Sequence, residues 1–380
     1  MSEKLDLMDL KILEGIGIHG PRNITRVARK LGIKAETLRK RLKRMPSHLF
    51  FRFHANIYCS NLGLKKSVVF AEATPGHEDL LLNCLKANDF WIYLNRCYGM
   101  NEGCFGIYTI PKDHYKDFEQ FLQSLETMGV AKNIQIFWST CFQSVNSKTN
   151  WFDEQSKTWV YSWDKWVEEI PTKDTQLPYT LVDPKDYPIE GDEIDVFILK
   201  ELEKNPTISL RALAKILGVS QQVVEYHYRK HILERDLIEN FEVFTLHYDL
   251  AVSDIFVFIF RFDSVEKCAK FAASLLDKPF VGGLGKVLGE NAIIGHVYLP
   301  RLDFRKFIDT LSKLARAGLL YSYDYVILDL RKAQRQTISY EYFKNGSWIY
   351  DHNKHIQNLR DLVEGAKLER RASPVFFSAL

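Results

Sequence analysis

The sequence contains few cysteines, and none of them is spaced like a metal ligand or a disulfide framework. Only 6 of the 380 residues are cysteine, they form no Cys-x-x-Cys pair, and most lie in the first half of the chain. We therefore expect reduced, partly buried thiols of a cytoplasmic protein. A zinc site needs clustered cysteine or histidine ligands, and so we expect no bound metal.

Long hydrophobic runs are also missing. No segment approaches the ~20 consecutive apolar residues that cross a bilayer. The first residues alternate charged and apolar side chains instead of forming a secretory signal. We expect no membrane partner and a cytoplasmic location.

A strong net charge is absent, because 51 lysines and arginines are nearly balanced by 48 acidic residues. The chain as a whole is no polycation, and its basic charge is local instead. Between residues 22 and 44 there are ten lysines and arginines and a single acidic residue, Glu36. A dense stretch of one sign indicates contact with nucleic acid, whereas the simpler interpretation is a solvated helix face.

Two short helices joined by a tight turn carry this charge. Residues 24–31 have helical spacing, Leu31-Gly32-Ile33 is the turn, and Leu38 and Leu42 recur at helical spacing after it. A further helix is predicted over residues 6–16. Together they predict a helix-turn-helix unit, whose last helix enters the DNA major groove.

Beyond residue 66 the pattern changes to alternating strands and helices. The predicted elements are strand 67–73, helix 77–86, strands 90–97 and 105–110, helix 115–128 and strand 134–138. This βαββαβ order predicts a ferredoxin-like unit. Residues 50–55 lie between the two units and are predicted to form a wing or a linking strand.

The second half of the chain repeats the first. Asp9 to Leu13 aligns with Asp195 to Leu199, and Ala28 to Ile33 aligns with Ala214 to Val219, both at a shift of 186 positions. We therefore predict an α+β fold with two winged helix-turn-helix domains and two ferredoxin-like βαββαβ domains in tandem, each followed by an extension. The expected boundaries are 1–52 and 191–240 for the helix-turn-helix domains, 53–145 and 241–331 for the ferredoxin-like domains, 146–190 for a Trp-rich hairpin with a proline-containing connector, and 332–380 for a C-terminal hairpin and helical tail.

The extensions contain a recurring Trp-Val/Ile-Tyr segment. It occurs at Trp159 to Tyr161 and again at Trp348 to Tyr350. The recurrence predicts an ordered hairpin in each extension. We expect these hairpins to pack on their own sheet, and the alternative is a surface for a partner of the transcription machinery.

The combination of a helix-turn-helix, a linking strand and a βαββαβ unit resembles the Lrp/AsnC transcription regulators. The sequence pattern of that family's helix-turn-helix is matched by Leu31 to Met45 and by Leu217 to Leu233. The resemblance implies that the ferredoxin-like parts mediate dimerisation and hold a small-molecule effector at the turn between their second and third strands. By resemblance the effector turns contain Gly99, Asn101, Glu102, Gly289, Glu290 and Asn291.

The outward positions of the two recognition helices are the candidate DNA contacts. Arginine makes bidentate contacts to guanine, lysine meets phosphate, and glutamine pairs with adenine. The predicted DNA-binding residues are Arg22, Arg26, Arg29, Lys34, Arg39, Lys40, Lys43, Arg44, Ser220, Gln221, Gln222, Tyr226 and Arg229. We expect a sequence-specific regulator of double-stranded DNA that acts as a covalent pseudo-dimer, needs no cofactor, is not an enzyme, and can form a further homodimer.

Two other functions remain as alternatives. Some proteins that resemble paired Lrp/AsnC units are decarboxylases of haem precursors, and His54, His114, His247 and His296 lie in or beside the predicted sheets. The other alternative is an interaction factor without DNA affinity of its own. His227 and His231 are spaced like a metal pair, but the neighbouring sequence offers no third ligand, and a place beside phosphates is the preferred interpretation.

Overall fold

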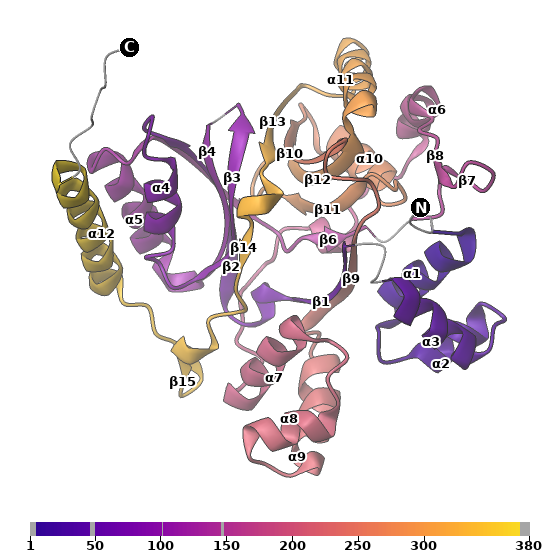
Figure 1. The fold of residues 1–380 in the computed structure, drawn as a ribbon, viewed down its shortest axis with the longest axis horizontal. Coiled ribbons are helices and arrows are strands. Elements are labelled where there is room, and N and C mark those ends of the chain that lie inside the picture. Colours follow the sequence, from indigo (N-terminus) through magenta and orange to yellow (C-terminus); the bar gives the residue numbers. More distant parts are fainter. Residues whose placement is uncertain (1–4, 46–49, 101, 146–147, 373–380) are drawn as a thin grey trace.

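The computed structural model describes residues 5–45, 50–100, 102–145 and 148–372, and the chain forms two successive copies of one arrangement (Figure 1). Each copy contains a helix-turn-helix unit, a long strand, a four-stranded unit with two helices, and an extension. The predicted α+β class with tandem units is confirmed. Among the described residues, no helix is long and apolar enough to cross a membrane.

The first helix-turn-helix unit consists of three helices, α1 (Leu7–His19), α2 (Ile24–Lys30) and α3 (Ala35–Arg44). A capping box begins α1: the Asp9 amide donates to the Asp6 carboxylate, and the Asp6 amide donates to the Asp9 carboxylate. This exchange satisfies two amides that would otherwise lack partners at the helix start. Leu38 is fully buried and holds α3 against the other helices, as its helical spacing predicts.

The second helix-turn-helix unit consists of α7 (Glu193–Lys204), α8 (Leu210–Leu217) and α9 (Gln221–Tyr226), followed without a break by the π-helical segment η6 (His227–Leu233). Its first helix begins with the same capping box, made here by Asp192 and Asp195. Gly218 ends α8 in the left-handed region, at a φ of +71°, which a glycine adopts without steric cost.

The strand after each helix-turn-helix unit pairs with its counterpart from the other repeat. Strand β1 (Phe50–Ile57) runs antiparallel to β9 (Ile238–Leu246) from one end to the other. Helix α1 packs on β9, and α7 packs on β1. The strand predicted over residues 50–55 as a wing or linking strand is therefore a linking strand, and it joins the two repeats in one ribbon.

Both ferredoxin-like units have the predicted βαββαβ order. The first contains β2 (Leu64–Ala73), α4 (Glu78–Leu85), β3 (Trp91–Gly99), β4 (Gly103–Pro111), α5 (Tyr115–Thr127) and β5 (Ala131–Ser139). The second contains β10 (Ser253–Arg261), α10 (Val265–Leu275), β11 (Val281–Lys286), β12 (Ala292–Pro300), α11 (Arg301–Arg316) and β13 (Ser322–Leu328). In space their strands lie in the corresponding orders β5-β2-β4-β3 and β13-β10-β12-β11.

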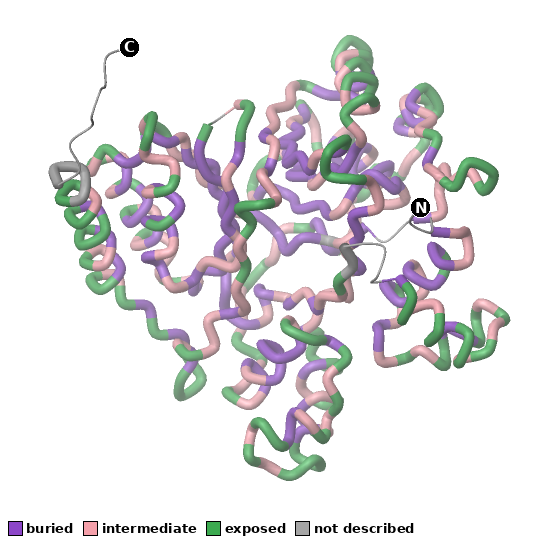
Figure 2. The backbone as a smooth tube through the Cα atoms, in the orientation of Figure 1, coloured by how far each residue is buried: buried purple, intermediate pink, exposed green. Residues whose placement is uncertain are grey.

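The two sheets are continuous, because β3 of the first pairs antiparallel with β13 of the second. The outer strands also approach one another, since the Thr140 amide donates to the Lys286 carbonyl at 2.9 Å. Two short strands extend the sheet, β6 (Gln143–Ser144) on β11 and β14 (Gln334–Arg335) on β3. The continuous sheet therefore encloses a space, which is filled by side chains of both ferredoxin-like units. They include residues that are at most 1% exposed: Val68, Phe70, Phe105, Val257, Ile259, Ile294 and Val326. Figure 2 shows these strands as the most deeply buried part of the chain.

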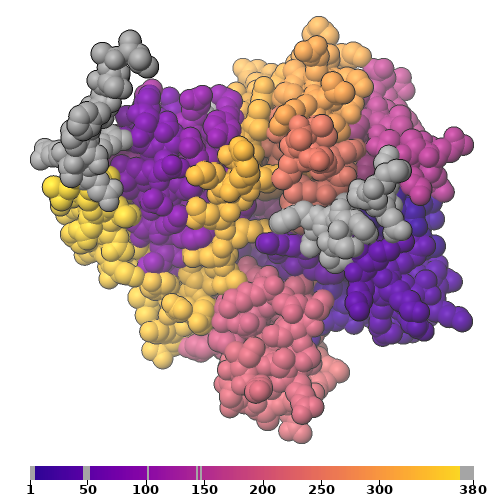
Figure 3. Space-filling model, viewed as in Figure 1, coloured from indigo at the N-terminus to yellow at the C-terminus, as the bar shows by residue number. Residues whose placement is uncertain are grey.

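Each extension covers the ferredoxin-like unit of the other repeat. The first has a hairpin, β7 (Phe152–Asp153) and β8 (Thr158–Trp159), and α6 (Trp163–Glu169), which packs on α11. The second has a hairpin, β15 (Phe343–Lys344) and β16 (Ser347–Trp348), and α12 (His352–Ala372), which packs on α4 and α5. The hairpins are ordered, as predicted, but the expected packing on their own sheet is wrong. Figure 3 shows the yellow second extension lying along the violet first unit.

Candidate nucleic-acid interface

The outward face of α3 is a row of exposed basic side chains. Arg39, Lys40 and Lys43 are exposed, as is Lys34 just before the helix. Lys40 forms an exposed pair with Glu36, at 3.0 Å, and such pairs contribute little to stability. Among the described residues, Arg39 and Lys43 face no carboxylate within ion-pair distance. Their charges are therefore available to an external anion.

Helix α2 adds Arg26, Arg29 and Lys30, which are also exposed. Val27 and Ala28 on its other side are 1% exposed and fix the helix in the unit. The burial pattern therefore turns the basic side chains of α2, like those of α3, toward solvent.

Two other basic residues of α3 are occupied inside the unit. Arg41 Nη1 donates to Asp6 Oδ2 and Asp9 Oδ1, both at 2.7 Å, and Arg44 Nη2 donates to Asp9 Oδ2 at 2.8 Å. Partial burial by itself raises the pKa of Asp6, but the hydrogen bonds from Arg41 and from the Asp9 amide bring this pKa below its ordinary value. The Arg44 guanidinium thus neutralises a carboxylate that is 1% exposed, while its own side chain is 42% exposed, so that its DNA contact stays a prediction.

Arg22, which is predicted to contact DNA, instead joins the two helix-turn-helix units. Its Nε donates to the Pro206 carbonyl at 3.1 Å, its Nη2 donates to the Ile208 carbonyl, and its guanidinium carbon lies 4.8 Å from the centre of the Tyr228 ring. Burial lowers the pKa of Arg22. The residue predicted to contact phosphate instead fixes one unit against the other, and the two units lie side by side in Figure 3.

The recognition helix of the second unit presents a more neutral face. Gln221, Gln222, Tyr226 and Arg229 are exposed, as predicted from their positions. Arg229 pairs with Glu225 of the same helix at 2.6 Å. The Ser220 hydroxyl accepts a hydrogen bond from an amide of α9 and serves as its N-cap. This face therefore offers amide groups for base edges and little charge for phosphates.

The two candidate effector turns have different neighbours. Gly99 pairs with Val326 at the junction of the sheets, Glu102 is exposed, and Asn101 lies outside the described residues. In the second turn the Gly289 amide donates to Asp183 at 2.9 Å. There Glu290 is exposed and Asn291 is half-buried. The two predicted effector turns therefore have different surroundings in the structure.

The four histidines of the decarboxylase alternative contact four different groups of side chains. His54 Nε2 lies 2.6 Å from Arg335 Nη1, and His114 Nδ1 lies 2.8 Å from Asp117. The ring of His247 packs on Trp159, and the ring of His296 stacks on Phe142. These contacts do not place the four histidine rings around one ligand.

A family model for the AsnC-type helix-turn-helix domain matches residues 192–230. The match falls on the second unit, although the first carries most of the basic charge. No curated protein sequence matches the chain.

Solved structures align with the chain at low identity. The siroheme decarboxylase NirDL covers 94% of this chain and 99% of its own, at 12% identity and a TM-score of 0.49. AsnC of Escherichia coli covers 39% of this chain and 98% of its own, at 21% identity and a TM-score of 0.28. A transcriptional regulator of Neisseria meningitidis, NMB0573 in complex with L-methionine, covers 35% and 88%, at 16% identity and a TM-score of 0.30.

The chain thus contains an AsnC-type helix-turn-helix domain, and the structure shows a helix-turn-helix unit followed by a ferredoxin-like unit twice in tandem. One expectation from the sequence is corrected here. The sequence predicts a protein that is not an enzyme, with a decarboxylase as an alternative, but two solved chains that align with nearly the whole length of this one are those of the siroheme decarboxylase NirDL.

Proposed function

We propose that this protein is a transcription regulator that binds double-stranded DNA with both helix-turn-helix units of one chain. The observation that carries the proposal is the outward face of α3, where Arg39 and Lys43 are exposed and face no carboxylate among the described residues. The deep burial of Leu38 on the opposite side of α3 orients this face toward solvent. A helix of this kind fits the major groove.

The two recognition helices contribute to DNA binding in different ways. The first supplies positive charge, and each phosphate that it neutralises releases condensed counterions, so that its contribution falls steeply with salt. The second supplies Gln221 and Gln222, whose side-chain amides can each accept a hydrogen bond from N6 of adenine and donate one to its N7, both on the major-groove edge of the base. We infer that α3 provides most of the affinity and that α9 provides most of the sequence preference.

The two helix-turn-helix units are connected to each other, and we infer that they bind one DNA duplex together. The linking strands pair along their whole length, and Arg22 bridges the two units directly. The relative orientation of the two recognition helices is therefore set before DNA arrives, which removes an ordering cost from binding. Because the two helices differ, the expected target is asymmetric.

The test is a binding titration on mixed-sequence duplex DNA at several salt concentrations. We expect the double variant Arg39→Ala/Lys43→Ala to bind more weakly and to show a salt slope that is smaller by about one to two units. The control is Arg305→Ala/Lys306→Ala, which removes the same charge from exposed positions of α11. Equal affinity and slope in the two variants would contradict the proposal. An absence of DNA affinity in the unmodified protein would favour an interaction factor of the transcription machinery.

A further inference from the structure

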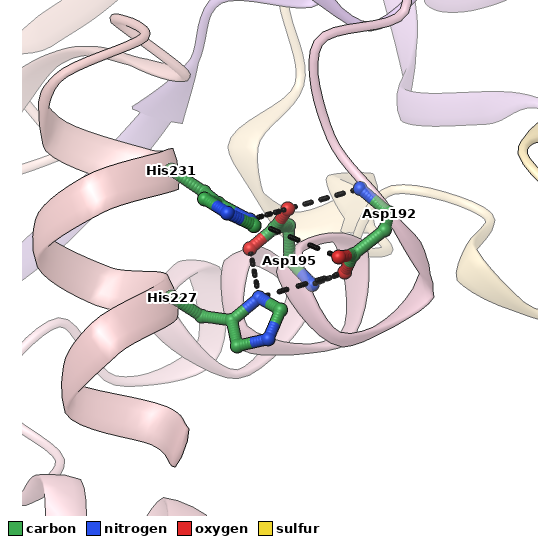
Figure 4. A group of neighbouring side chains, drawn as sticks. All are labelled: Asp192, Asp195, His227 and His231. Carbon is green, nitrogen blue, oxygen red and sulfur yellow. Dashed lines mark hydrogen bonds and ion pairs between the residues drawn. The ribbon is translucent and has the colours of Figure 1, made fainter. Parts of the chain in front are cut away.

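Four side chains with metal-ligating atoms meet in the second helix-turn-helix unit. Asp192 and Asp195 stand at the start of α7, and His227 and His231 lie one turn apart on η6 (Figure 4). One ligand atom from each side chain lies within 4.8 Å of all the others. The four therefore converge on one small volume between two helices.

The separations between these atoms are close to the spacing of ligands around a tetrahedral ion. His227 Nδ1 lies 2.8 Å from Asp195 Oδ1, and His231 Nδ1 lies 2.9 Å from Asp195 Oδ2. The same two nitrogens lie 3.6 and 3.7 Å from the oxygens of Asp192. Ligands that bind a tetrahedral zinc ion at about 2.0–2.1 Å are about 3.3 Å apart. The two shorter distances are hydrogen bonds between the imidazoles and different oxygens of Asp195, and the set with one ligand atom from each residue lies within 4.8 Å. Small side-chain shifts therefore bring the four atoms to the spacing of zinc ligands.

The site is buried on three sides and open on the fourth. The side chain of Asp195 is 0% exposed, and those of His227 and His231 are 10% and 12% exposed, whereas that of Asp192 is 44% exposed. An ion therefore has a way in past Asp192. Among the described residues, neither aspartate has a lysine or arginine within ion-pair distance. Buried negative charge is costly when no cation accompanies it.

The first repeat shows what occupies the corresponding place there. At the shift of 186 positions, Asp6 and Asp9 correspond to the two aspartates, and Arg41 and Met45 correspond to the two histidines. In the first repeat the Arg41 guanidinium lies 2.7 Å from both carboxylates and supplies the positive charge. In the second repeat the carboxylate pair is kept, and two imidazole ligands replace the built-in cation.

We propose that Asp192, Asp195, His227 and His231 bind a divalent transition-metal ion, with zinc as the best fit. Two imidazole nitrogens with two carboxylate oxygens suit zinc and its neighbours in the first transition row, whereas magnesium and calcium favour oxygen alone. Each ring binds through the lone pair of Nδ1 and carries its proton on Nε2. The ion joins the start of α7 to η6, as Arg41 joins α1 to α3.

The proposal assigns the ion a structural role that does not depend on DNA binding. An ion held by both helices stabilises the folded protein, because the four ligands are brought together only by folding. The π-helical turn that begins at His227 is a local irregularity of a kind that is frequent at functional sites.

The test uses the full-length protein stripped with a chelator and then titrated with Zn²⁺ by calorimetry and with Co²⁺ by visible absorption. We expect one equivalent of tight Zn²⁺ binding, the visible bands of tetrahedral Co²⁺, and a rise in the melting temperature with Zn²⁺. The variant His227→Gln/His231→Gln should lose the Co²⁺ bands.

A second variant guards against misfolding. Asp192→Asn keeps a good N-cap for α7 and should weaken Zn²⁺ binding by more than about tenfold. The control is His114→Gln, which breaks a comparable surface pair between His114 and Asp117, 2.8 Å apart, and should leave the titration unchanged. The proposal is overturned if the unmodified protein shows no tetrahedral Co²⁺ spectrum, or if His114→Gln lowers Zn²⁺ binding as much as the site variants do.

Discussion

Trp166 lies parallel to Phe307, with ring centres 5.9 Å apart and planes inclined by 9°, although the two residues belong to different repeats. The indole is fully buried, and its Nε1 donates to the Ser274 hydroxyl at 3.0 Å. The second extension packs on the first ferredoxin-like unit in the same way, because the rings of Trp348 and Phe90 lie 6.2 Å apart. The repeats are therefore interlocked, and neither ferredoxin-like unit completes its helical layer alone.

This interlocking predicts that the first extension stabilises the second unit. Trp166→Ala should lower the free energy of unfolding by about 3–5 kcal/mol, because it removes a large buried ring and leaves a cavity. Chemical denaturation followed by circular dichroism measures the change. Tyr179→Ala, at a position in the same connector that is 81% exposed, should change stability by less than about 0.5 kcal/mol. Similar losses in both variants would show that the extension does not contribute through this packing.

Arg22 and Arg26 should separate stability from DNA affinity. Arg22→Ala leaves the carbonyls of Pro206 and Ile208 without their donor and should cost about 1–3 kcal/mol of stability. Arg26→Ala, at an exposed position, should leave stability nearly unchanged and weaken DNA binding. Denaturation and DNA titrations on both variants check this. The interpretation fails if Arg22→Ala unfolds at the same denaturant concentration as the unmodified protein.

Arg41 should be a structural residue and Lys43 a binding residue, although both belong to α3. Arg41→Ala removes one of the two guanidinium groups on the buried Asp9 carboxylate and leaves that of Arg44, and it should cost about 1–3 kcal/mol of stability. Lys43→Ala, which removes an exposed charge, should cost less than about 0.5 kcal/mol. Thermal melts of the two variants give the comparison, and a larger loss in Lys43→Ala would reverse our assignment.

Stability should fall as the pH drops below about 6.5, because two half-buried histidines resist protonation in the folded state. Burial and the nearby Arg335 lower the pKa of His54 to about 3 and that of His296 to about 4. The unfolded chain therefore binds more protons between these values and 6.5, and the free energy of unfolding decreases toward acid by up to about 1.4 kcal/mol per pH unit for each histidine.

Denaturation between pH 4.5 and 7.5 measures this dependence. His296→Gln should show a shallower slope than the unmodified protein, because it removes one of the two histidines with a lowered pKa. An unmodified protein whose stability does not change across this range would rule out buried neutral histidines.

The local elements were predictable from the sequence, because they depend on nearby residues. The spacing of Leu38 and Leu42 marked α3, and alternating strands and helices marked the βαββαβ units. The shift of 186 positions revealed the duplication. These signals are local periodicities or direct repeats, and tertiary contacts reinforced them.

The packing of each linking strand and each extension on the other repeat was not predictable from such local signals. A strand pattern at Phe50 to Ala55 shows that a strand exists, but its partner Phe241 to Leu246 is chosen by tertiary packing. Likewise, the tryptophans of the first extension indicate a buried hairpin without indicating which unit buries it. Two copies of similar surface make own-repeat and cross-repeat packing equally compatible with the sequence.

The candidate site was predictable in part. Exposure of Arg39 and Lys43 follows from helical spacing, but a run of basic residues does not show that Asp9 lies against Arg44. The alignment of the two repeats carries a further signal. The repeat alignment places Asp192 and Asp195 opposite the aspartates that hold Arg41, and it places His227 opposite that arginine. The partners of His227 and His231 are therefore distant in the sequence, and the repeat alignment indicates them.

The central claim is that two unlike recognition helices of one chain read one DNA duplex. Its most direct test is a hydroxyl-radical footprint on a duplex that the protein selects from a random-sequence library. We predict two adjacent protected segments, one of which is lost in Arg39→Ala/Lys43→Ala and the other in Gln221→Ala/Gln222→Ala. A duplex without protection at low salt, or one footprint that both variants leave unchanged, would contradict the account.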